Sequence, residues 1–282
     1  DMPLLGEPAT AKQLSAIGDA GVLALVCDST NVFNEHASGS EGDVRKGLDE
    51  VIQAATGRVL VTTFASNAAR LQTLGEVARD TGRALCVAGR SLNRILSVAK
   101  ASGYLRDFPE TVDFDKAMTL PRDKVMIVAT GGQGEPRAAL SRVAEGSHPI
   151  KLEAGDTVIF SARAIPGNEE SIEALVTRLQ ELGVRVITAE DADLPIHASG
   201  HPAQEELELM YKWVKPAIAI PVHGEAEHME THADIAKETG VSRAMVGRNG
   251  DLFMIRPVPG IRRQVVETGR LGWHKEGLVR VE

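Results

Sequence analysis

The chain has 282 residues, which is enough for one large or two ordinary domains with buried cores. Hydrophobic residues make up 43% and charged residues 25% of the sequence, as in soluble globular proteins. The net charge of −8 excludes a general nucleic-acid-binding surface, so a polyanion would have to meet a local basic site. No apolar stretch reaches the length of a membrane span and we find no signal peptide, so we expect a cytoplasmic protein without membrane contact.

The start of the chain and its cysteines add two expectations. The opening Asp1-Met2-Pro3-Leu4 does not read like a natural N-terminus, so we expect the chain to come from the middle of a longer polypeptide. Cys27 and Cys86 both lie in apolar runs. We interpret them as buried, reduced thiols of a cytosolic protein.

Apolar runs and helical patterns alternate along the chain. Runs typical of buried strands occur at residues 21–27, 58–64, 84–88, 124–129, 157–162, 184–188 and 217–222. Helical patterns end near residue 55, follow Ser66 and Gly89, and cover about 169–182, 203–214 and 225–239. This alternation predicts an α/β protein whose parallel sheet is covered by helices on both faces.

Three further stretches carry weaker expectations. Residues 105–122 look irregular and are rich in proline and acidic groups. Strand-like pieces at 243–247 and 251–256 flank Asn249-Gly250, which predicts a hairpin turn between them. The tail from residue 257 shows no clear pattern.

Three of the eight histidines lie in two short stretches at joints between apolar runs and helical patterns. The first stretch is His197-Ala198-Ser199-Gly200-His201, and the second contains His223-Gly224-Glu225. Imidazole binds metals and moves protons near neutral pH, so histidines at strand ends favour a functional site over a structural role. Glycine lies beside His201 and His223, where it allows the backbone to approach a ligand closely.

Asp28 ends the first buried run, much as His223 follows a later one. A carboxylate at a strand end is where α/β folds place chemistry, although a helix N-cap is an equal alternative for Asp28. Carboxylate and imidazole together are typical ligands of zinc or manganese, but two ligands do not complete a site. His228 and His232 lie four residues apart without the glutamate of the zinc-protease motif, so we interpret them as helix surface.

Two loops could bind phosphate. Thr130 to Gly134 places three glycines between a strand and a helix, where exposed amides suit an anion, but a plain tight turn explains the glycines equally well. Arg90-Ser91 occupies a similar strand-to-helix position, with solvated surface as the alternative. Several such loops on one sheet edge would favour a phosphate-binding face.

Together these motifs resemble the β-CASP nucleases of the metallo-β-lactamase fold, and among them the bacterial ribonuclease J family. The matching segments keep the family's order over about residues 20–230, and the two histidine stretches are the most specific, because the interval from His201 to His223 is like the family's. The segments are Asp28-Ser29-Thr30-Asn31, Phe64-Ala65-Ser66-Asn67, Gly89-Arg90-Ser91, Thr130-Gly131-Gly132-Gln133-Gly134-Glu135-Pro136, Ile165-Pro166-Gly167-Asn168-Glu169, His197-Ala198-Ser199-Gly200-His201 and Pro221-Val222-His223-Gly224-Glu225.

The resemblance implies a role for each matching residue. Asp28 and His223 would be ligands of a two-zinc centre, with manganese or magnesium as other metals that the family uses. His201 would act on the scissile phosphate as proton donor or phosphate clamp. The stretch His197, Ala198, Ser199, Gly200 and His201 would hold an RNA phosphate, and Arg90 and Ser91 would contribute to substrate binding.

The resemblance also implies the architecture: a β-CASP domain, a parallel sheet with flanking helices, inserted into a partial metallo-β-lactamase αββα fold. We expect residues 1–40 and 191–282 to belong to the lactamase fold, the second stretch including the tail, and 41–190 to form the β-CASP domain. The family's HxHxDH metal signature is absent from the chain. We therefore expect an N-terminal lactamase half as a partner, and an apolar face that it leaves bare on residues 1–20 and 195–256.

The function implied is that of a metal-dependent ribonuclease. It would hydrolyse single-stranded RNA in RNA processing and decay, with 5′-to-3′ exonuclease action as one form. The alternative is a non-catalytic RNA-binding scaffold that has lost the metal centre, since Asp28 and His223 alone would bind zinc weakly. We further expect a homo-oligomer, and we expect the chain to lack activity by itself if its metal centre is incomplete.

Overall fold

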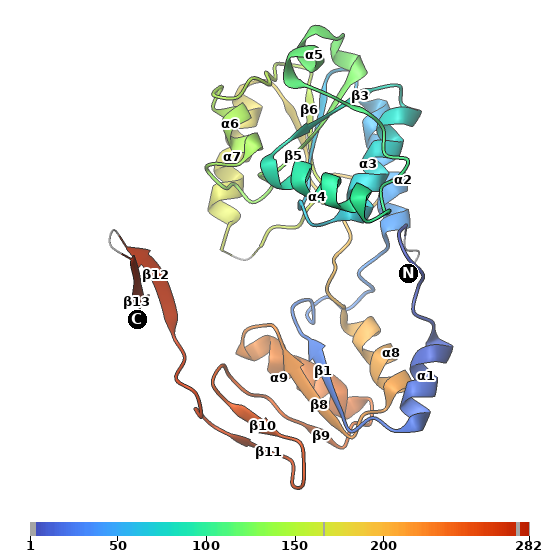
Figure 1. The fold of residues 1–282 in the computed structure, drawn as a ribbon, viewed down its shortest axis with the longest axis vertical. Coiled ribbons are helices and arrows are strands. Elements are labelled where there is room, and N and C mark those ends of the chain that lie inside the picture. Colours follow the sequence, from blue (N-terminus) through green and yellow to red (C-terminus); the bar gives the residue numbers. More distant parts are fainter. Residues whose placement is uncertain (1–3, 166, 275–276, 282) are drawn as a thin grey trace. The chain divides into compact units, whose positions relative to one another are not determined.

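The computed structural model describes residues 4–165, 167–274 and 277–281. Residues 1–3, at the start of the predicted first lactamase segment, and Pro166, within one matching segment, lie outside the described residues. The chain folds into two compact units, each made of two stretches of sequence (Figure 1). Unit 1 comprises Asp1–Pro8 and Gly39–Ala198, and unit 2 comprises Ala9–Ser38 and Ser199–Glu282.

Unit 1 is built on a six-stranded sheet in which all neighbouring strands are parallel. The strand order is β4-β3-β5-β2-β6-β7. The bounds are β2 (Val59–Thr62), β3 (Ala84–Ala88), β4 (Thr111–Val112), β5 (Val125–Ala129), β6 (Thr157–Phe160) and β7 (Arg185–Ile187). Because the strands are parallel, the loops after β2, β3, β5 and β6 emerge at the same edge.

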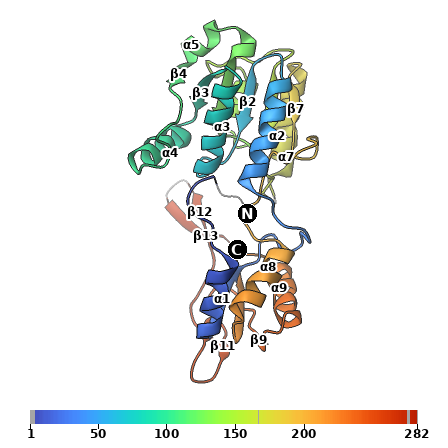
Figure 2. The same ribbon diagram turned by 90° about the vertical axis from the view of Figure 1, so that its right-hand side faces the viewer.

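Helices cover both faces of this sheet, and Figure 2 shows α2 and α3 side by side on one of them. One face bears α2 (Glu41–Ala54), α3 (Ala68–Asp80) and α4 (Arg90–Ala101), and the other bears α5 (Phe114–Thr119), α6 (Ala139–Ala144) and α7 (Glu169–Glu181). Side chains along β2 alternate between the two cores, since Val59 and Val61 join the first cluster and Leu60 the second. The predicted α/β class with a doubly covered parallel sheet is therefore confirmed.

Unit 2 contains a smaller parallel sheet of order β1-β8-β9. Its elements are α1 (Ala11–Ala20), β1 (Ala24–Asp28), α8 (Gln204–Val214), β8 (Ile218–Val222), α9 (Ala226–Glu238) and β9 (Arg243–Ala244). Helix α1 packs on α8 so closely that a Cβ on Gly18 would lie 2.2 Å from the Trp213 carbonyl oxygen. Asp28 pairs with Val222, so β1 and β8 end side by side.

Three local expectations were wrong. The predicted hairpin across Asn249-Gly250 does not form, because β9 instead extends the parallel sheet and β10 (Leu252–Met254) pairs with β11 (Gly260–Arg262). The tail, which showed no pattern, contains β11 and the hairpin of β12 (Arg270–His274) and β13 (Gly277–Val281). The stretch 105–122 contains β4 and α5, with a short 3₁₀ turn beginning at Arg122.

In the described residues of 4–20 and 195–256, the strongly exposed large apolar side chains are Ile17, Leu209 and Leu252, on three different elements. The expected large apolar face stays a prediction. Cys86 is buried and Cys27 half-buried, and both are free thiols. Among the described residues, every helix is too short or too polar to cross a bilayer.

Candidate metal centre

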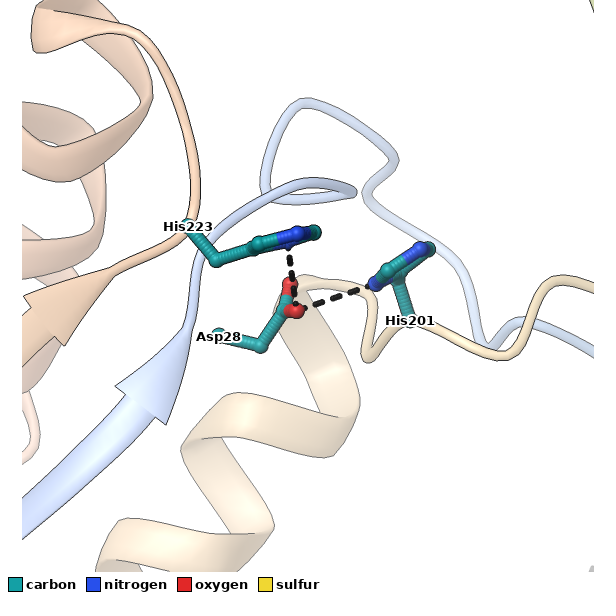
Figure 3. Close-up of side chains that lie close together, drawn as sticks. All are labelled: Asp28, His201 and His223. Carbon is teal, nitrogen blue, oxygen red and sulfur yellow. Dashed lines mark hydrogen bonds and ion pairs between the residues drawn. The ribbon is translucent and has the colours of Figure 1, made fainter. Parts of the chain in front are cut away.

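Asp28, His201 and His223 converge in unit 2, although they come from three separate segments (Figure 3). One potential ligand atom from each lies within 4.8 Å of the others. Nδ1 of His201 and Nδ1 of His223 each lie 3.0 Å from Oδ2 of Asp28. Asp28 ends β1 and His223 directly follows β8, so the parallel pairing of these strands brings both side chains to one sheet edge.

The turn after β8 holds His223 in an unusual backbone conformation. Its φ of 60° lies in the left-handed region, which is uncommon for residues other than glycine and is found at functional sites. The next residue, Gly224, has no room for a side chain, because a Cβ there would lie 2.7 Å from Cβ of His228. The tight turn therefore depends on glycine beside the histidine, whereas from the sequence we had assigned this glycine to close approach of a ligand.

Thr30 fixes the orientation and the tautomer of the His223 ring. Its hydroxyl donates to the His223 carbonyl oxygen at 2.8 Å and lies 2.6 Å from Nδ1 of the same residue. With the hydroxyl proton donated to the carbonyl oxygen, Nδ1 carries the ring proton, which faces both Oγ1 of Thr30 and Oδ2 of Asp28. The neutral ring is then unprotonated at Nε2, which leaves that atom able to bind a metal.

The backbone of His201 is held from the loop after β1. Its carbonyl oxygen accepts from the Ser38 hydroxyl at 2.7 Å and from the Asn31 side chain at 3.4 Å, and its amide donates to Oγ of Ser199 at 3.1 Å. Its ring lies nearly parallel to that of His223, with 5.4 Å between centroids. These contacts place the imidazole over the end of β1 before any ligand binds.

Asp28 remains ionised over a wide pH range. Burial raises the pKa of this carboxyl group, but hydrogen bonds from the Thr30 amide and the His201 ring outweigh that effect, so the pKa lies below its ordinary value. Its Oδ1 accepts from the Thr30 amide at 2.8 Å, which leaves Oδ2 for the two histidines. Oδ1 of Asp28 thus forms a local turn, which is close to the N-cap alternative, while Oδ2 faces the two histidines.

The chemistry of these donors fits a divalent metal. One carboxylate and two imidazoles are the ligands that zinc and similar metals take in proteins, and catalytic zinc sites often have three protein ligands. The three side chains are 29% (Asp28), 42% (His201) and 66% (His223) exposed, so an ion and a substrate can reach them. The arrangement can therefore hold a metal or orient an imidazole for proton transfer.

A second layer lies beneath this cluster and involves His232, which we had wrongly interpreted as helix surface. Its side chain is completely buried. Nδ1 lies 2.9 Å from Oγ of Ser29 and Nε2 lies 2.8 Å from the hydroxyl of Tyr211. Ser29 follows Asp28, so the buried chain Ser29–His232–Tyr211 supports the turn that carries the carboxylate.

The sequence contains a signal that identifies this burial. Ile235 and Ala236 follow His232 by three and four residues, and both are buried on the same face of α9. Burial lowers the pKa of His232 to about 4, so the ring is neutral near pH 7. His228 is half-buried, and its ring lies 4.7 Å from that of Phe33.

The other predicted site residues divide between the two units. His197 and Ala198 end the second stretch of unit 1, whereas Ser199, Gly200 and His201 belong to unit 2. Burial, followed by the charge of Arg70, lowers the pKa of His197 to about 4. A Cβ on Gly200 would meet no atom within 4 Å, so its backbone is open to a ligand.

Arg90 and Ser91 lie in unit 1 at the first turn of α4, and both are exposed. No side chain caps this helix, so its first amides lack a side-chain acceptor. Ser91 lines a cavity of about 250 Å³ at the edge of the six-stranded sheet, together with residues that follow β2, β5 and β6. An anion could meet the helix N-terminus here.

The glycine loop after β5 is mainly a structural turn. The Gln133 amide donates to the Glu135 carboxylate at 3.0 Å, and the Gly134 amide donates to the Gly131 carbonyl at 3.2 Å. Two of the amides that we considered for phosphate binding thus already donate hydrogen bonds, and one of these bonds goes to a carboxylate. Helix α6 begins only at Ala139, so it does not directly follow the loop.

Comparison with known proteins places two family models on the chain. Residues 56–179 match "Ribonuclease J, beta-CASP domain", and this range lies within unit 1. Residues 195–246 match "Zn-dependent metallo-hydrolase RNA specificity domain". The second match includes the histidine stretch and His223, but not Asp28.

Curated proteins from several bacteria align along most of the chain. Ribonuclease J of Sinorhizobium meliloti is 41% identical over 98% of this chain and 48% of its own length. Ribonuclease J of Mycolicibacterium smegmatis is 41% identical over 85% of the chain and 43% of its own length, and ribonuclease J 1 of Streptococcus pyogenes is 38% identical over 90% and 46%. The chain thus spans about half the length of the relatives it matches.

Proposed function

The chain belongs to the ribonuclease J family, and from this premise we propose that it acts in a metal-dependent ribonuclease that hydrolyses phosphodiester bonds of single-stranded RNA. RNA processing and decay would be its setting, in the cytoplasm, with 5′-to-3′ exonuclease action as one form. The observation that carries the proposal is the meeting of Asp28, His201 and His223 at the end of two parallel strands. Relatives named ribonuclease J support the choice of RNA as substrate.

In this proposal Asp28 and His223 hold zinc, or manganese or magnesium in its place. Oδ2 of the ionised carboxylate and Nε2 of His223, kept unprotonated by Thr30, are the ligand atoms. When bound, the metal would supply Lewis acidity that lowers the pKa of water and offsets phosphate charge. A complete centre with two metals needs more ligands than these residues provide, so we expect weak binding to this chain.

His201 is the proposed proton donor. Its Nδ1 faces the Asp28 carboxylate at 3.0 Å, which orients the ring. Nε2 is then available to give a proton to the ribose oxygen that leaves when the phosphodiester breaks. The ring is 42% exposed, so a bound strand can reach this atom.

Phosphates of the strand would be held by backbone and hydroxyl groups. We assign this role to His197, Ala198, Ser199 and Gly200 in the histidine stretch, and to Arg90 and Ser91 at the start of α4. We further propose that unit 1 is the β-CASP domain and that unit 2 belongs to the metallo-β-lactamase fold. The boundaries 40/41 and 190/191 then shift to 38/39 and 198/199, and residues 4–8, which we had expected in the lactamase segment, lie in unit 1. The range of the first family match supports this division.

The proposal is tested by incubating the chain, and the longest reading frame that contains it, with 5′-phosphorylated single-stranded RNA and zinc or manganese. Cleavage that leaves 5′-monophosphates and disappears with a chelator supports the nuclease. Binding without cleavage by either protein would instead support the alternative of a non-catalytic scaffold. If neither protein binds nor cleaves the RNA, both functions fail.

A further inference from the structure

The chain passes between the two units at three places, 8/9, 38/39 and 198/199, and within unit 1 the last two connecting segments end at the same point. The first of these two enters unit 1 at Gly39, and the second leaves it after Ala198. A Cβ on Gly39 would lie 3.9 Å from Cβ of Ala198, so the two segments run side by side there. Glu41 begins α2 just after the first segment, and Ile196 is buried just before the second departs.

Arg70 lies between these segments and bonds to both. It belongs to α3 and its side chain is 0% exposed. Nε and Nη2 each donate to the Glu41 carboxylate at 2.9 Å. Nη1 donates to the Ser161 carbonyl oxygen at 2.9 Å and also reaches the Ser161 hydroxyl and, at 3.4 Å, the Ile196 carbonyl oxygen.

Neighbouring groups complete this network. The Ser161 hydroxyl donates to the Ile196 carbonyl oxygen at 2.7 Å. Asn67 caps α3 through the Arg70 amide and also donates to Glu41 at 2.8 Å. One guanidinium thus connects the start of α2, the end of β6 and the start of the histidine stretch.

A buried guanidinium is costly unless its charge is paired and its N–H groups are satisfied. Here the Glu41 carboxylate accepts hydrogen bonds from Nε and Nη2 of Arg70. Backbone oxygens of Ser161 and Ile196 accept from the remaining amino group, Nη1. A lysine could keep the charge but could not bridge three segments, because its ammonium is a single point of contact. The planar shape of the guanidinium, and not only its charge, is therefore needed to bridge the three segments.

We propose that Arg70, paired with Glu41, is a positioning residue that fixes the start of the histidine stretch 196–201, and with it the groups proposed to bind RNA phosphate. Arg70 itself faces the protein interior and would not touch RNA. The claim that Arg70 affects RNA binding rests on the proposed function. The claim that Arg70 holds the histidine stretch in place does not. The two claims can therefore fail separately.

Amide hydrogen exchange on the full 282-residue chain tests the fixing of the stretch without RNA or metal. We choose Arg70→Lys, which breaks the fork, Glu41→Gln, which removes the paired charge, and Ser161→Ala, which removes only the bridging hydroxyl. The matched control is Arg45→Lys, because Arg45 forms a partly exposed ion pair with Glu76 on the same pair of helices. Exchange of a peptide covering β5 reports whether the fold persists.

We expect Arg70→Lys and Glu41→Gln to speed exchange in residues 194–202 about tenfold or more, with β5 and the control unchanged. Ser161→Ala should have a smaller effect in the same peptide. Affinity for 5′-phosphorylated single-stranded RNA should fall about tenfold in the first two variants. Should Arg70→Lys unfold β5 as well, Glu41→Gln and Ser161→Ala decide the outcome.

Exchange in 194–202 equal to wild type in the variants that keep β5 protected would overturn the proposal. Faster exchange with unchanged RNA affinity would also overturn it, because the positioned stretch would then have no part in binding. If the wild-type chain shows no RNA affinity at all, the proposed function is what fails, and the exchange result still decides whether Arg70 fixes the stretch.

Discussion

Oδ2 of Asp28 lies 3.0 Å from Nδ1 of His201, a residue 173 positions later in the chain. A carboxylate at this distance orients an imidazole, as in acid–base pairs of other hydrolases. The same oxygen lies 3.0 Å from Nδ1 of His223. Asp28 is therefore the residue on which the geometry of both histidines depends.

Replacing His201 by alanine should remove the proton donor and leave the fold intact. Where the wild type cleaves RNA, we expect the rate to fall by roughly 10² to 10⁴-fold in the His201→Ala variant. The matched control is His36→Ala, because His36 is an exposed histidine of the same unit. Turnover of His201→Ala equal to that of the control would remove the catalytic role.

Thr30→Val should weaken metal binding without touching a ligand. The hydroxyl sets the His223 tautomer, and loss of such supporting groups lowers metal affinity by roughly 10 to 100-fold. Calorimetric titration with zinc measures the effect, and Thr177→Val on the exposed face of α7 serves as control. Equal zinc affinities in the two variants would show that Thr30 has no such role.

Tyr211→Phe should destabilise the fold through His232. The phenol lies 2.8 Å from Nε2 of the buried ring, so its removal leaves a buried polar atom without a partner. We expect the free energy of unfolding to fall by about 1–3 kcal/mol, as measured by urea denaturation. Tyr104 is 60% exposed, and Tyr104→Phe should change stability by less than about 0.5 kcal/mol. A similar small change for Tyr211→Phe would show that the hydrogen bond between Tyr211 and His232 does not stabilise the fold.

Stability should fall as the solution is acidified, because two histidines are buried in their neutral form. The pKa values of His197 and His232 are lowered from 6.5 to about 4 in the folded chain. Between these values only the unfolded chain takes up the protons, so stability present above pH 6.5 is lost as the pH falls towards 4 and then levels off. Urea denaturation as a function of pH measures this loss.

A His232→Gln variant separates the contribution of this ring from the other titrating groups. Its stability should depend less steeply on pH between 6.5 and 4 than that of the wild type, because one of the two buried groups no longer takes up a proton on unfolding. Parallel pH profiles for the two proteins would mean that His232 titrates normally in the fold.

The sequence was informative where chemistry coincides with strand ends. The apolar runs ending at Asp28 and Val222 predicted two parallel strands, and parallel pairing alone places Asp28 and His223 at one edge. The unit 1 sheet was predictable for the same reason. The spacing of apolar residues in buried strands and helices is a local pattern, so a single sequence shows it.

Other features depend on contacts that a local pattern does not contain. The partner of β10 is β11 and not β9, because β9 pairs with β8 in the parallel sheet. The burial of His232 has a local signal in Ile235 and Ala236, but its partners Ser29 and Tyr211 come from distant segments that the sequence does not connect to it. The role of Arg70 likewise rests on Glu41 and Ser161, which no spacing in the sequence connects to it.

Zinc-edge anomalous diffraction from crystals of the chain soaked in zinc tests the metal centre most directly. We predict the strongest anomalous peak within about 2.0–2.2 Å of a carboxylate oxygen of Asp28 and of Nε2 of His223, with the His201 ring beside it. The peak should vanish in Asp28→Asn crystals treated alike. Zinc bound elsewhere on the chain, with no peak between these residues, would contradict the account.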